Sequence, residues 1–454
     1  MSQRETIDHN IKINMPADVK TIISTLENAG FEAYAVGGCV RDSLLGREPN
    51  DWDITTNAKP EQTKELFHRT IDTGLQHGTV TILMNHVGYE VTTYRIDGSY
   101  EDSRHPSSVT FTSDLTEDLK RRDFTINAMA YNDRSGIVDV FHGIEDMEKK
   151  IIRAVGDPCE RFTEDALRIM RAVRFSAQLG YEIEEETKKA ITSLAPTLAN
   201  ISAERIQVEL VKLVTSAHPE KMMDIYETGI GDVILPEFVL AMNTVQNNPH
   251  HMYSVGEHIV KSMTYIEADR YLRLAMLIHD LGKPVCKTTD EKGIDHFYGH
   301  PEVSEQIGVK ILRRLKFDND TIRMVSILVR FHDYRFGSNK KALRRAMNKI
   351  GKDAFPLVLK VQQADILAQS SYQRDEKQNR LDEANVLYKE ILKDGECVDL
   401  KSLAITGSDL IAWGMKPGKE IGEVLSYLLD LVIEEPSLNN QEDLYEKYQQ
   451  FIEK

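Results

Sequence analysis

The sequence has few cysteines and no long apolar segment. Its four cysteines stand far apart along 454 residues and form no Cys-x-x-Cys pair. This pattern excludes a disulfide scaffold or a cysteine-rich zinc module and is typical of the reducing cytoplasm. No stretch approaches the roughly 20 uncharged apolar residues of a membrane span, and the first residues lack the apolar core of a secretion signal. We therefore expect a cytoplasmic protein with no membrane segment.

The chain also lacks an excess of basic charge. Its 56 Lys and Arg residues against 72 Asp and Glu residues give a net charge of −16. This balance by itself argues against a nucleic-acid binder, because phosphate contact favours a basic surface. Basic residues are nevertheless clustered at 120–122, 161–174 and 340–352. A cluster of this kind is usually a solvated face, so the three clusters permit RNA binding without proving it.

Apolar spacing divides the chain into a mixed part and a helical part. A helix predicted over 17–30 is followed by strand-like runs at 31–36, 80–83 and 89–94, each bounded by turn residues. From residue 161 onward the spacing is helical almost without interruption. It is clearest at 166–179, 206–214, 272–281, 311–327, 355–367 and 421–432. We expect an α/β head followed by an all-helical body, with about three domains in all.

Two short patterns near the N-terminus indicate phosphate and metal chemistry. Gly37-Gly38 followed by Arg41 would let the backbone approach a phosphate, although such a turn alone is more often structural. In a strand, Asp51 and Asp53 would project from one face and bind the same cations. Oxygen ligands at this spacing suit Mg²⁺, and two such ions activate an attacking hydroxyl and neutralise a leaving pyrophosphate.

A third pattern places acids and arginines three or four residues apart in one predicted helix. Its members are Glu164, Asp165, Arg168, Arg171 and Arg174. A salt-bridged surface helix is the plain alternative, but the other side of the helix is apolar and the arginines outnumber the acids. A carboxylate next to a guanidinium matches the amino group and ring acceptor that cytosine and adenine share. Such a pair would accept CTP and ATP and reject UTP and GTP.

Three runs in this order resemble the class II tRNA nucleotidyltransferase family, which includes CCA-adding enzymes and bacterial poly(A) polymerases. The runs are VGGCVRDSLLGREPNDWDI, DLKRRDFTINAMAYN and EDALRIMRAVRFSAQLGY. The resemblance covers roughly residues 20–215 and implies an α+β fold with a five-stranded, mixed nucleotidyltransferase palm and an elongated all-α remainder. The expected domains are a head (1–150), a neck for base recognition (151–235), an HD-type body (236–375) and a tail that contacts tRNA (376–454).

The resemblance also implies a role for each matching residue. Gly38 and Arg41 would hold the triphosphate, Asp51 and Asp53 two catalytic Mg²⁺ ions, Arg122 the nucleotide and Asp123 the ribose. Asp165 and Arg168 would read the base edge, with Arg171 and Arg174 adding nucleotide and phosphate contacts. Residues 139–143 occupy the place of a motif that couples head and neck. Residues 202–209 would brace the neck helix.

A second resemblance lies in the predicted body. His279-Asp280, within LAMLIHDLGKP, resembles the signature pair of the HD phosphohydrolase superfamily. The other expected ligands are His258, His300, His332 and Asp365. They would hold one or two divalent metals and activate water against a phosphomonoester or a 2′,3′-cyclic phosphate. A scaffold that has lost its metal is the alternative, and His250, His251 and His296 are assigned to loops.

The leading interpretation is a CCA-adding enzyme. It would add C, C and A to the 3′ end of tRNA from CTP and ATP, release pyrophosphate and use no template. The loop 97–109 looks full-length, whereas CC-adding members have a shortened one, and this favours complete addition. An A-adding enzyme or a poly(A) polymerase of the same family is the nearest alternative. An HD hydrolase with a nucleotide-sensing head and a non-catalytic RNA-binding protein are further alternatives, against which the intact Asp51 and Asp53 argue.

Overall fold

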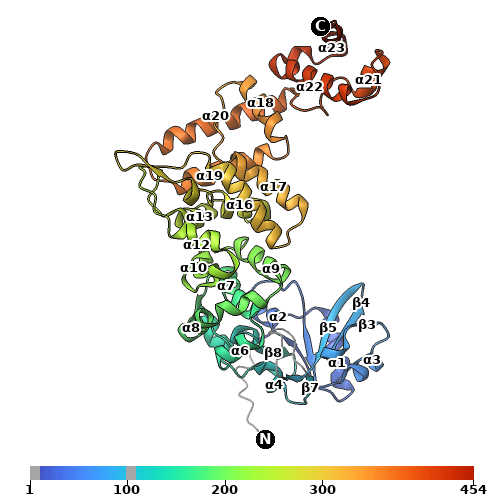
Figure 1. Ribbon diagram of the computed structural model, residues 1–454. Coiled ribbons are helices and arrows are strands. Elements are labelled where there is room, and N and C mark those ends of the chain that lie inside the picture. Colours follow the sequence, from blue (N-terminus) through green and yellow to red (C-terminus); the bar gives the residue numbers. More distant parts are fainter. Residues whose placement is uncertain (1–10, 99–108, 454) are drawn as a thin grey trace. The chain divides into compact units, whose positions relative to one another are not determined.

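The computed structural model describes residues 11–98 and 109–453, and the chain divides into two compact units (Figure 1). The first unit ends at Pro236 and the second begins at Glu237. The division falls beside the boundary expected between neck and body, while the other expected boundaries stay predictions.

The first unit is built on a mixed sheet with the strand order β3-β4-β5-β2-β1-β8-β9. Its strands are β1 (Ala33–Val36), β2 (Ile54–Thr56), β3 (Thr70–Gly74), β4 (Thr79–Met84), β5 (Val87–Thr93), β8 (Met129–Asn132) and β9 (Gly136–Asp139). The expectation of five strands was wrong, since the described residues form seven. The edge strand β3 has mostly exposed side chains and therefore lacks the apolar alternation that predicts a strand.

Burial explains why β1 lies at the centre of this sheet. All four of its residues are buried, and it pairs antiparallel with both β2 and β8, with Ala35 opposite Ile54 on one side and Tyr131 on the other. The predicted helix at 17–30 is confirmed as α1 (Ala17–Asn28), whose apolar stripe is buried. β2 continues the sheet parallel to β5, which places the segment before β2 beside β5.

Helices and two small sheets complete the first unit. The helices are α2 (Gly38–Leu44), α3 (Pro60–Leu66), α4 (Leu115–Lys120), α5 (Gly143–Glu148), α6 (Pro158–Glu164), α7 (Leu167–Leu179), α8 (Glu185–Leu194), α9 (Ala203–Val214), α10 (Met222–Glu227) and α11 (Ile230–Ile234). The small sheets are β6 (Arg95–Asp97) with β7 (Val109–Phe111) and β10 (Ile151–Ile152) with β11 (Glu182–Ile183).

The second unit is helical apart from one small hairpin, as the spacing predicted. Its helices are α12 (Pro236–Met242, at the boundary), α13 (Val255–Met263), α14 (Arg270–Ile278), α15 (Lys283–Cys286), α16 (His300–Arg314), α17 (Asn319–Phe331), α18 (Lys340–Ile350), α19 (Phe355–Ala368), α20 (Arg374–Lys393), α21 (Gly407–Ala412), α22 (Lys419–Glu434) and α23 (Gln441–Ile452), and its hairpin is β12 (Thr288–Thr289) with β13 (Asp295–His296). The apolar spacing at 311–327 covers two helices, because Lys316 has a positive φ of 60° and Asp318 caps α17.

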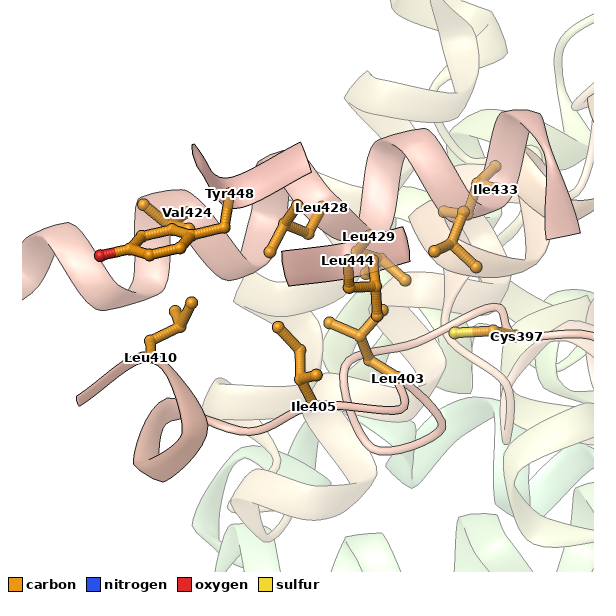
Figure 2. Packing of buried hydrophobic residues seen from close by; sticks show 11 residues of the cluster. Cys397, Leu403, Ile405, Leu410, Val424, Leu428, Leu429, Ile433, Leu444 and Tyr448 are labelled. Atoms are coloured by element: carbon orange, nitrogen blue, oxygen red, sulfur yellow. The ribbon is translucent and has the colours of Figure 1, made fainter. Parts of the chain in front are cut away.

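The last helices of the second unit have a hydrophobic core of their own (Figure 2). Leu428 and Val432 of α22 and Leu444 of α23 are fully buried in it. Burying such a side chain contributes about 1.5–3 kcal/mol, so this core holds the C-terminal helices together. All four cysteines are free. Among the helices described here, none has both the length and the apolarity that crossing a bilayer requires.

Candidate active site and candidate metal centre

Gly37 turns the chain from β1 into α2. Its φ of +83° favours glycine, and a Cβ added there would lie 3.0 Å from Arg122 Nη1. The backbone N–H of Gly37 donates to Met129 O at 3.1 Å, and that of Val36 donates to Asp53 O at 2.9 Å. The turn therefore holds the predicted triphosphate residues, Arg122 and the predicted metal ligands close together.

Asp51 and Asp53 directly precede β2 and share one face. Both are exposed, whereas Trp52 and Ile54 between and after them are buried. Desolvation raises the pKa of Asp53, Arg122 lowers it, and the neighbouring Asp51 raises it. The pair thus carries negative charge that the protein compensates only in part, which fits a site for a divalent cation.

Glu90 of β5 is a third carboxylate here, and sequence reasoning missed it. Ile54 pairs with Val91 in the parallel β2–β5 ladder, so one residue earlier Asp53 lies beside Glu90. Desolvation raises the pKa of Glu90, and so do Asp53 and Asp51. The exposed position of Glu90 beside the buried Val91 was a signal in the sequence, but only the register shows which strand it neighbours.

Arg41 of α2 is buried, and its guanidinium is fixed on two sides. Its Nη1 donates to Asn127 Oδ1 at 2.6 Å and its Nε donates to Asp42 Oδ1 at 2.9 Å. Asn127 belongs to the turn that follows the predicted Arg121-Arg122-Asp123 motif. Arg41 is therefore held in one orientation between two motifs that lie far apart in the sequence.

Arg121 and Arg122 share the buried carboxylate of Asp118. Asp118 Oδ1 accepts from Arg121 Nε at 2.9 Å, and Asp118 Oδ2 lies 3.5 Å from Arg122 Nη2. Burial opposes the ionisation of Asp118, but the two guanidiniums lower its pKa below the ordinary value. Asp118 thus keeps Arg122 beside Gly37 and Asp53.

Asp123 binds Arg171 of α7. Its Oδ2 accepts from Arg171 Nε at 2.7 Å, while its Oδ1 accepts from the Phe124 N–H at 2.9 Å and from Asn127 Nδ2 at 3.1 Å. Burial opposes ionisation, but Arg171 and these bonds hold the pKa of Asp123 well below its usual range. Asp123 positions Arg171, and its contact with a ribose stays a prediction.

Three guanidiniums surround the Phe175 ring of α7. Their carbon atoms lie 5.1 Å (Arg41), 5.3 Å (Arg171) and 3.8 Å (Arg174) from the ring centre, and Phe124 meets the same ring edge to face at 5.8 Å. Cation–π attraction offsets part of the repulsion among the three charges. The arrangement concentrates positive charge where a polyanionic triphosphate is expected.

Arg174 is the most enclosed of the three. Its side chain is 7% exposed, its Nε donates to Glu209 of α9, and its Nη1 donates to Gln178 Oε1 at 2.8 Å. The expectation that residues 202–209 brace the neck helix is confirmed by this contact. A phosphate contact by Arg174 stays a prediction.

The prediction of one continuous helix through Glu164–Arg174 was wrong. The chain leaves the helical conformation at Asp165, where φ is −137° and ψ is 102°, between α6 and α7. Asp165 Oδ1 accepts from the Leu167 N–H at 3.0 Å, and Asp165 Oδ2 accepts from Arg205 Nη2 at 2.9 Å. A carboxylate that binds a free amide favours the start of a new helix at this place over continuation of the old one.

Arg168 lies one turn after Asp165 and has different partners. Its Nη1 donates to Glu164 Oε2 at 2.7 Å and its Nη2 donates to Arg121 O at 2.8 Å. The structure therefore brings Asp165 and Arg168 to the start of one helix, each bound to its own neighbour. Their contact with a base stays a prediction.

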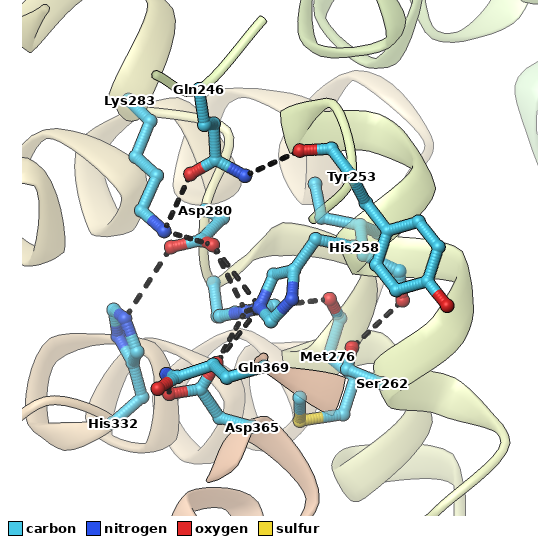
Figure 3. Close-up of polar contacts among 12 residues, drawn as sticks. Gln246, Tyr253, His258, Ser262, Met276, Asp280, Lys283, His332, Asp365 and Gln369 are labelled. Carbon is cyan, nitrogen blue, oxygen red and sulfur yellow. Dashed lines mark hydrogen bonds and ion pairs between the residues drawn. The ribbon is translucent and has the colours of Figure 1, made fainter. Parts of the chain in front are cut away.

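The six predicted ligands of the second unit meet in one cluster, in which all but the partly exposed Asp365 are buried. Figure 3 labels four of them, His258, Asp280, His332 and Asp365. His258, His279, Asp280 and Asp365 form one group and Asp280, His300 and His332 another, with the ligand atoms of each group within 4.8 Å of one another. The Nε2 atoms of His258 and His279 are 3.4 Å apart, and those of His300 and His332 are 3.1 Å apart. Asp280 belongs to both groups, and this donor set fits one or two divalent metals.

Helix ends bring these ligands together, and backbone carbonyls orient three of the rings. His279, His300 and His332 donate from Nδ1 to the carbonyls of Met276 (2.7 Å), Phe297 (2.8 Å) and Val329 (2.6 Å). A proton on Nδ1 leaves the Nε2 lone pair for a metal, as in many histidine metal sites. The cluster also contains a positive charge, because Lys283 Nζ lies 2.7 Å from the carboxylate oxygen Asp280 Oδ2.

The basic cluster at 340–352 is largely neutralised within the second unit. Lys340 and Arg344 of α18 form ion pairs with Glu396, and Lys341 and Arg345 form ion pairs with Glu434. Four of the basic side chains that permitted RNA binding therefore bind carboxylates of the same unit. These ion pairs connect α18 to Glu396 and to Glu434 of α22.

Three family models match the chain. "Poly A polymerase head domain" matches residues 33–153, "Probable RNA and SrmB-binding site of polymerase A" matches 180–242, and "tRNA nucleotidyltransferase domain 2" matches 289–448. None of the three descriptions addresses the HD-type cluster, which stays a prediction supported by its geometry.

Curated and solved relatives agree with these models. The CCA-adding enzyme of Lactobacillus helveticus is 38% identical over 448 residues, which are 96% of this chain and 98% of that protein. The CCA-adding enzyme of Leuconostoc mesenteroides is 54% identical over 208 residues, about half of each chain (46% and 52%). A solved structure, the Bacillus stearothermophilus CCA-adding enzyme in complex with CTP, has a TM-score of 0.70 and 29% identity, covering 97% of this chain and 100% of that one.

The α+β head with its three carboxylates, joined to a helical neck, places the protein among the nucleotidyltransferases. Within that class, the 38% identity to the Lactobacillus helveticus protein, along almost the whole length of both chains, decides the family. The chain belongs to the family of the CCA-adding enzymes. The resemblance and the fold class inferred from the sequence are both confirmed.

Proposed function

We propose that this nucleotidyltransferase adds C, C and A to the 3′ end of tRNA, using CTP and ATP, releasing pyrophosphate and using no nucleic-acid template. Its near full-length similarity to a CCA-adding enzyme is the observation that carries this proposal. The cytoplasm, where tRNA matures, is its proposed location. Complete addition, as opposed to addition of A alone, rests on the length of the loop 97–109, and residues 99–108 of it lie outside the described part of the chain.

The triphosphate has a defined place in this proposal. Gly38 and Arg41 follow the glycine turn, and Arg171 joins Arg41 at the Phe175 ring. A triphosphate bound here would form charge-assisted hydrogen bonds with these guanidiniums, and such bonds are about twice as strong as neutral ones. Arg122 beside Asp53 would contact the same nucleotide.

Asp51, Asp53 and Glu90 would hold the catalytic metal ions, for which we propose Mg²⁺. The raised pKa values of Asp53 and Glu90 support this assignment, because they reflect desolvation together with repulsion among the carboxylates, and a divalent cation would relieve the repulsion. Bound there, the metal would activate the terminal hydroxyl of the tRNA and neutralise the departing pyrophosphate. The protein supplies three oxygen donors and keeps Arg122 next to them.

Asp165 and Arg168 would select the base. The carboxylate accepts from the exocyclic amino group of C or A, and the guanidinium donates to the ring acceptor beside it. To do so, Asp165 would give up its bond to Arg205 and Arg168 its bond to Glu164. Base binding thus exchanges protein contacts for nucleotide contacts of the same kind.

A direct assay tests the proposal. A tRNA transcript that lacks its CCA end is incubated with each nucleoside triphosphate singly and with CTP and ATP together. We expect two cytidines from CTP alone and a complete CCA end from the mixture. Addition of A alone, or of long A tails, would identify one of the alternative family activities. Asp51→Asn should abolish addition, whereas Asp72→Asn, an exposed carboxylate of the edge strand β3, should not.

The cluster of His258, His279, Asp280, His300, His332 and Asp365 favours a second activity, phosphohydrolysis. We propose that it binds one or two divalent metals and acts on a phosphomonoester or a 2′,3′-cyclic phosphate. The test loads the purified protein with Mn²⁺, Ni²⁺, Mg²⁺ or Zn²⁺ and measures metal content and the hydrolysis of 2′,3′-cyclic AMP. Absence of bound metal from wild type, or metal content unaffected by His332→Gln, would refute it.

A further inference from the structure

Lys377, in the first turn of α20, stands beside the metal cluster without a carboxylate partner. Its Nζ donates to His250 Nδ1 at 3.1 Å and to Gln369 Oε1. Among the residues that the structure describes, no ion pair involves Lys377. Its ammonium charge is therefore bound only to neutral groups.

One side chain connects Lys377 to the cluster. Gln369 binds Lys377 through Oε1 and donates from Nε2 to Asp365 Oδ2 at 2.8 Å, and Figure 3 shows Gln369 next to Asp365. Burial lowers the pKa of Lys377, and the charges that act on it include those of Asp365 and Lys283. Lys377 thus lies within electrostatic reach of the metal ligand Asp365.

His251 adds a buried, unpartnered nitrogen beside another ligand of the cluster, His258. Its ring meets that of His258 edge to face with centres 5.2 Å apart, and its Nδ1 is buried with no hydrogen-bond partner among the described atoms. Burial lowers the pKa of His251 to about 2; the charge of Lys283 lowers it as well, and that of Asp280 raises it. A buried polar atom without a partner costs free energy unless a ligand or water satisfies it.

We propose that Lys377 and His251 form an oxyanion-binding subsite of the cluster, which receives the non-bridging oxygens of a phosphate ester. The inference rests on the second activity proposed above and names the residues that would hold its substrate. A dianionic phosphate gives Lys377 the charge partner that it lacks and gives His251 a hydrogen-bond partner. Lys377 adds positive charge beside Asp365, and positive charge close to the metals favours the approach of a phosphate anion.

Phosphate binding measured by calorimetry tests the subsite without relying on turnover. Inorganic phosphate is titrated into the Mn²⁺-loaded full-length protein and, separately, into the metal-free protein. Loss of a charge-assisted contact should weaken binding by roughly 10- to 100-fold in Lys377→Met. Lys377→Arg should stay close to wild type, and so should Lys389→Ala, an exposed lysine further along the same helix. Metal content should be unchanged in all three variants.

The outcomes separate the two proposals. If wild type takes up no metal, the proposal of a second activity fails. The phosphate titration of the metal-free protein then decides the inference, because phosphate binding that does not depend on Lys377 overturns it. If metal is bound and Lys377→Met binds phosphate as wild type does, only the inference fails. His251→Phe gives an independent measurement, in which weaker phosphate binding with unchanged metal content is expected. If Lys377→Met loses both its metal and its phosphate binding, Lys377 has a purely structural role and the inference is overturned.

Discussion

Single side chains at the candidate nucleotidyltransferase site are arranged against stability. Desolvation and the neighbouring Asp51 raise the pKa of Asp53 while Arg122 lowers it, and desolvation, Asp53 and Asp51 raise the pKa of Glu90. A raised pKa in the folded state means that ionised Asp53 costs folding free energy at neutral pH. The cost is relieved as the pH falls through the folded pKa, where the carboxyl becomes neutral.

Asp53→Asn should therefore raise the thermal stability of the metal-free first unit at pH 7 while it abolishes nucleotide addition. The difference in melting temperature from wild type should shrink as the pH falls toward about 4, near the ordinary pKa of aspartate. Added Mg²⁺ should stabilise wild type and not the variant. Thermal unfolding followed by Trp52 fluorescence in a Trp413→Phe background measures this, because each unit contains one tryptophan. A variant that is less stable than wild type would contradict the argument.

Arg168→Ala should relax base choice more than it weakens nucleotide binding. A bidentate base contact contributes about 1–3 kcal/mol of discrimination, so misincorporation of UTP or GTP relative to CTP should rise roughly 10- to 100-fold. The triphosphate contacts, which belong to Arg41 and the metal ligands, remain. Single-nucleotide incorporation with all four triphosphates is the measurement.

Arg161→Ala is the matched control for that variant, because Arg161 also binds Glu164 but lies outside the proposed base contact. It should keep the preference for CTP. If Arg168→Ala loses activity uniformly and keeps its CTP preference, the start of α7 is a scaffold and the base-reading assignment is wrong.

At the scale of elements, the same residue types serve different purposes in α7 and α18. Arg171 and Arg174 of α7 pair with Asp123 and Glu209 and also lie against the Phe175 ring, where we propose that the triphosphate binds. The arginines of α18 each meet a carboxylate: Arg344 meets Glu396, and Arg345 meets Glu434. The sequence shows both as basic clusters, and only the packing of neighbouring elements tells them apart.

The two ion pairs of α18 predict unequal effects on stability. The side chain of Arg344 is 6% exposed and also donates to Ile433 O at 2.8 Å, whereas that of Arg345 is 60% exposed. Breaking a buried pair costs about 3–5 kcal/mol, and an exposed pair contributes about 0–1 kcal/mol. Arg344→Met should lower the free energy of unfolding of the second unit by several times more than Arg345→Ala.

Denaturation followed by Trp413 fluorescence in a Trp52→Phe background measures this difference, because Trp413 packs on the core to which Ile433 belongs. Equal effects of the two variants would contradict the assignment of Arg344 as a buried brace. A large loss of tRNA affinity in Arg345→Ala at unchanged stability would restore an RNA-binding role to this cluster.

At the scale of the whole molecule, the two sites belong to different compact units. The carboxylates of the nucleotidyltransferase site lie in the first unit, and the histidine–aspartate cluster lies in the second. Sites without shared partners usually respond to substitution independently, within about 0.5 kcal/mol. The two activities should therefore be separable by point mutation.

His332→Gln should remove metal binding and cyclic-phosphate hydrolysis and leave CCA addition within about twofold of wild type. Asp51→Asn should abolish CCA addition and leave hydrolysis unchanged. Both activities are assayed on the same preparations. Loss of both activities in either variant, in protein that retains its fold by circular dichroism, would show that the units are coupled.

The sequence by itself determined the family and the α+β head with its helical remainder, and it named most of the side chains that the structure brings together at the two candidate sites. This was so because short motifs such as Gly37-Gly38 with Asp51 and Asp53, or His279-Asp280, combine residue types whose chemistry is specific at a fixed spacing. Tertiary structure decided what depends on contacts between distant segments. The strand register added Glu90 to the carboxylates, and a carboxylate–amide bond ended the helix at Asp165. Acids of α20, of the segment after α20 and of α22 paired with four basic side chains of α18. Spacing along a chain reports the neighbours of a residue on its own helix or strand, whereas charge compensation and register are set by the elements packed against it.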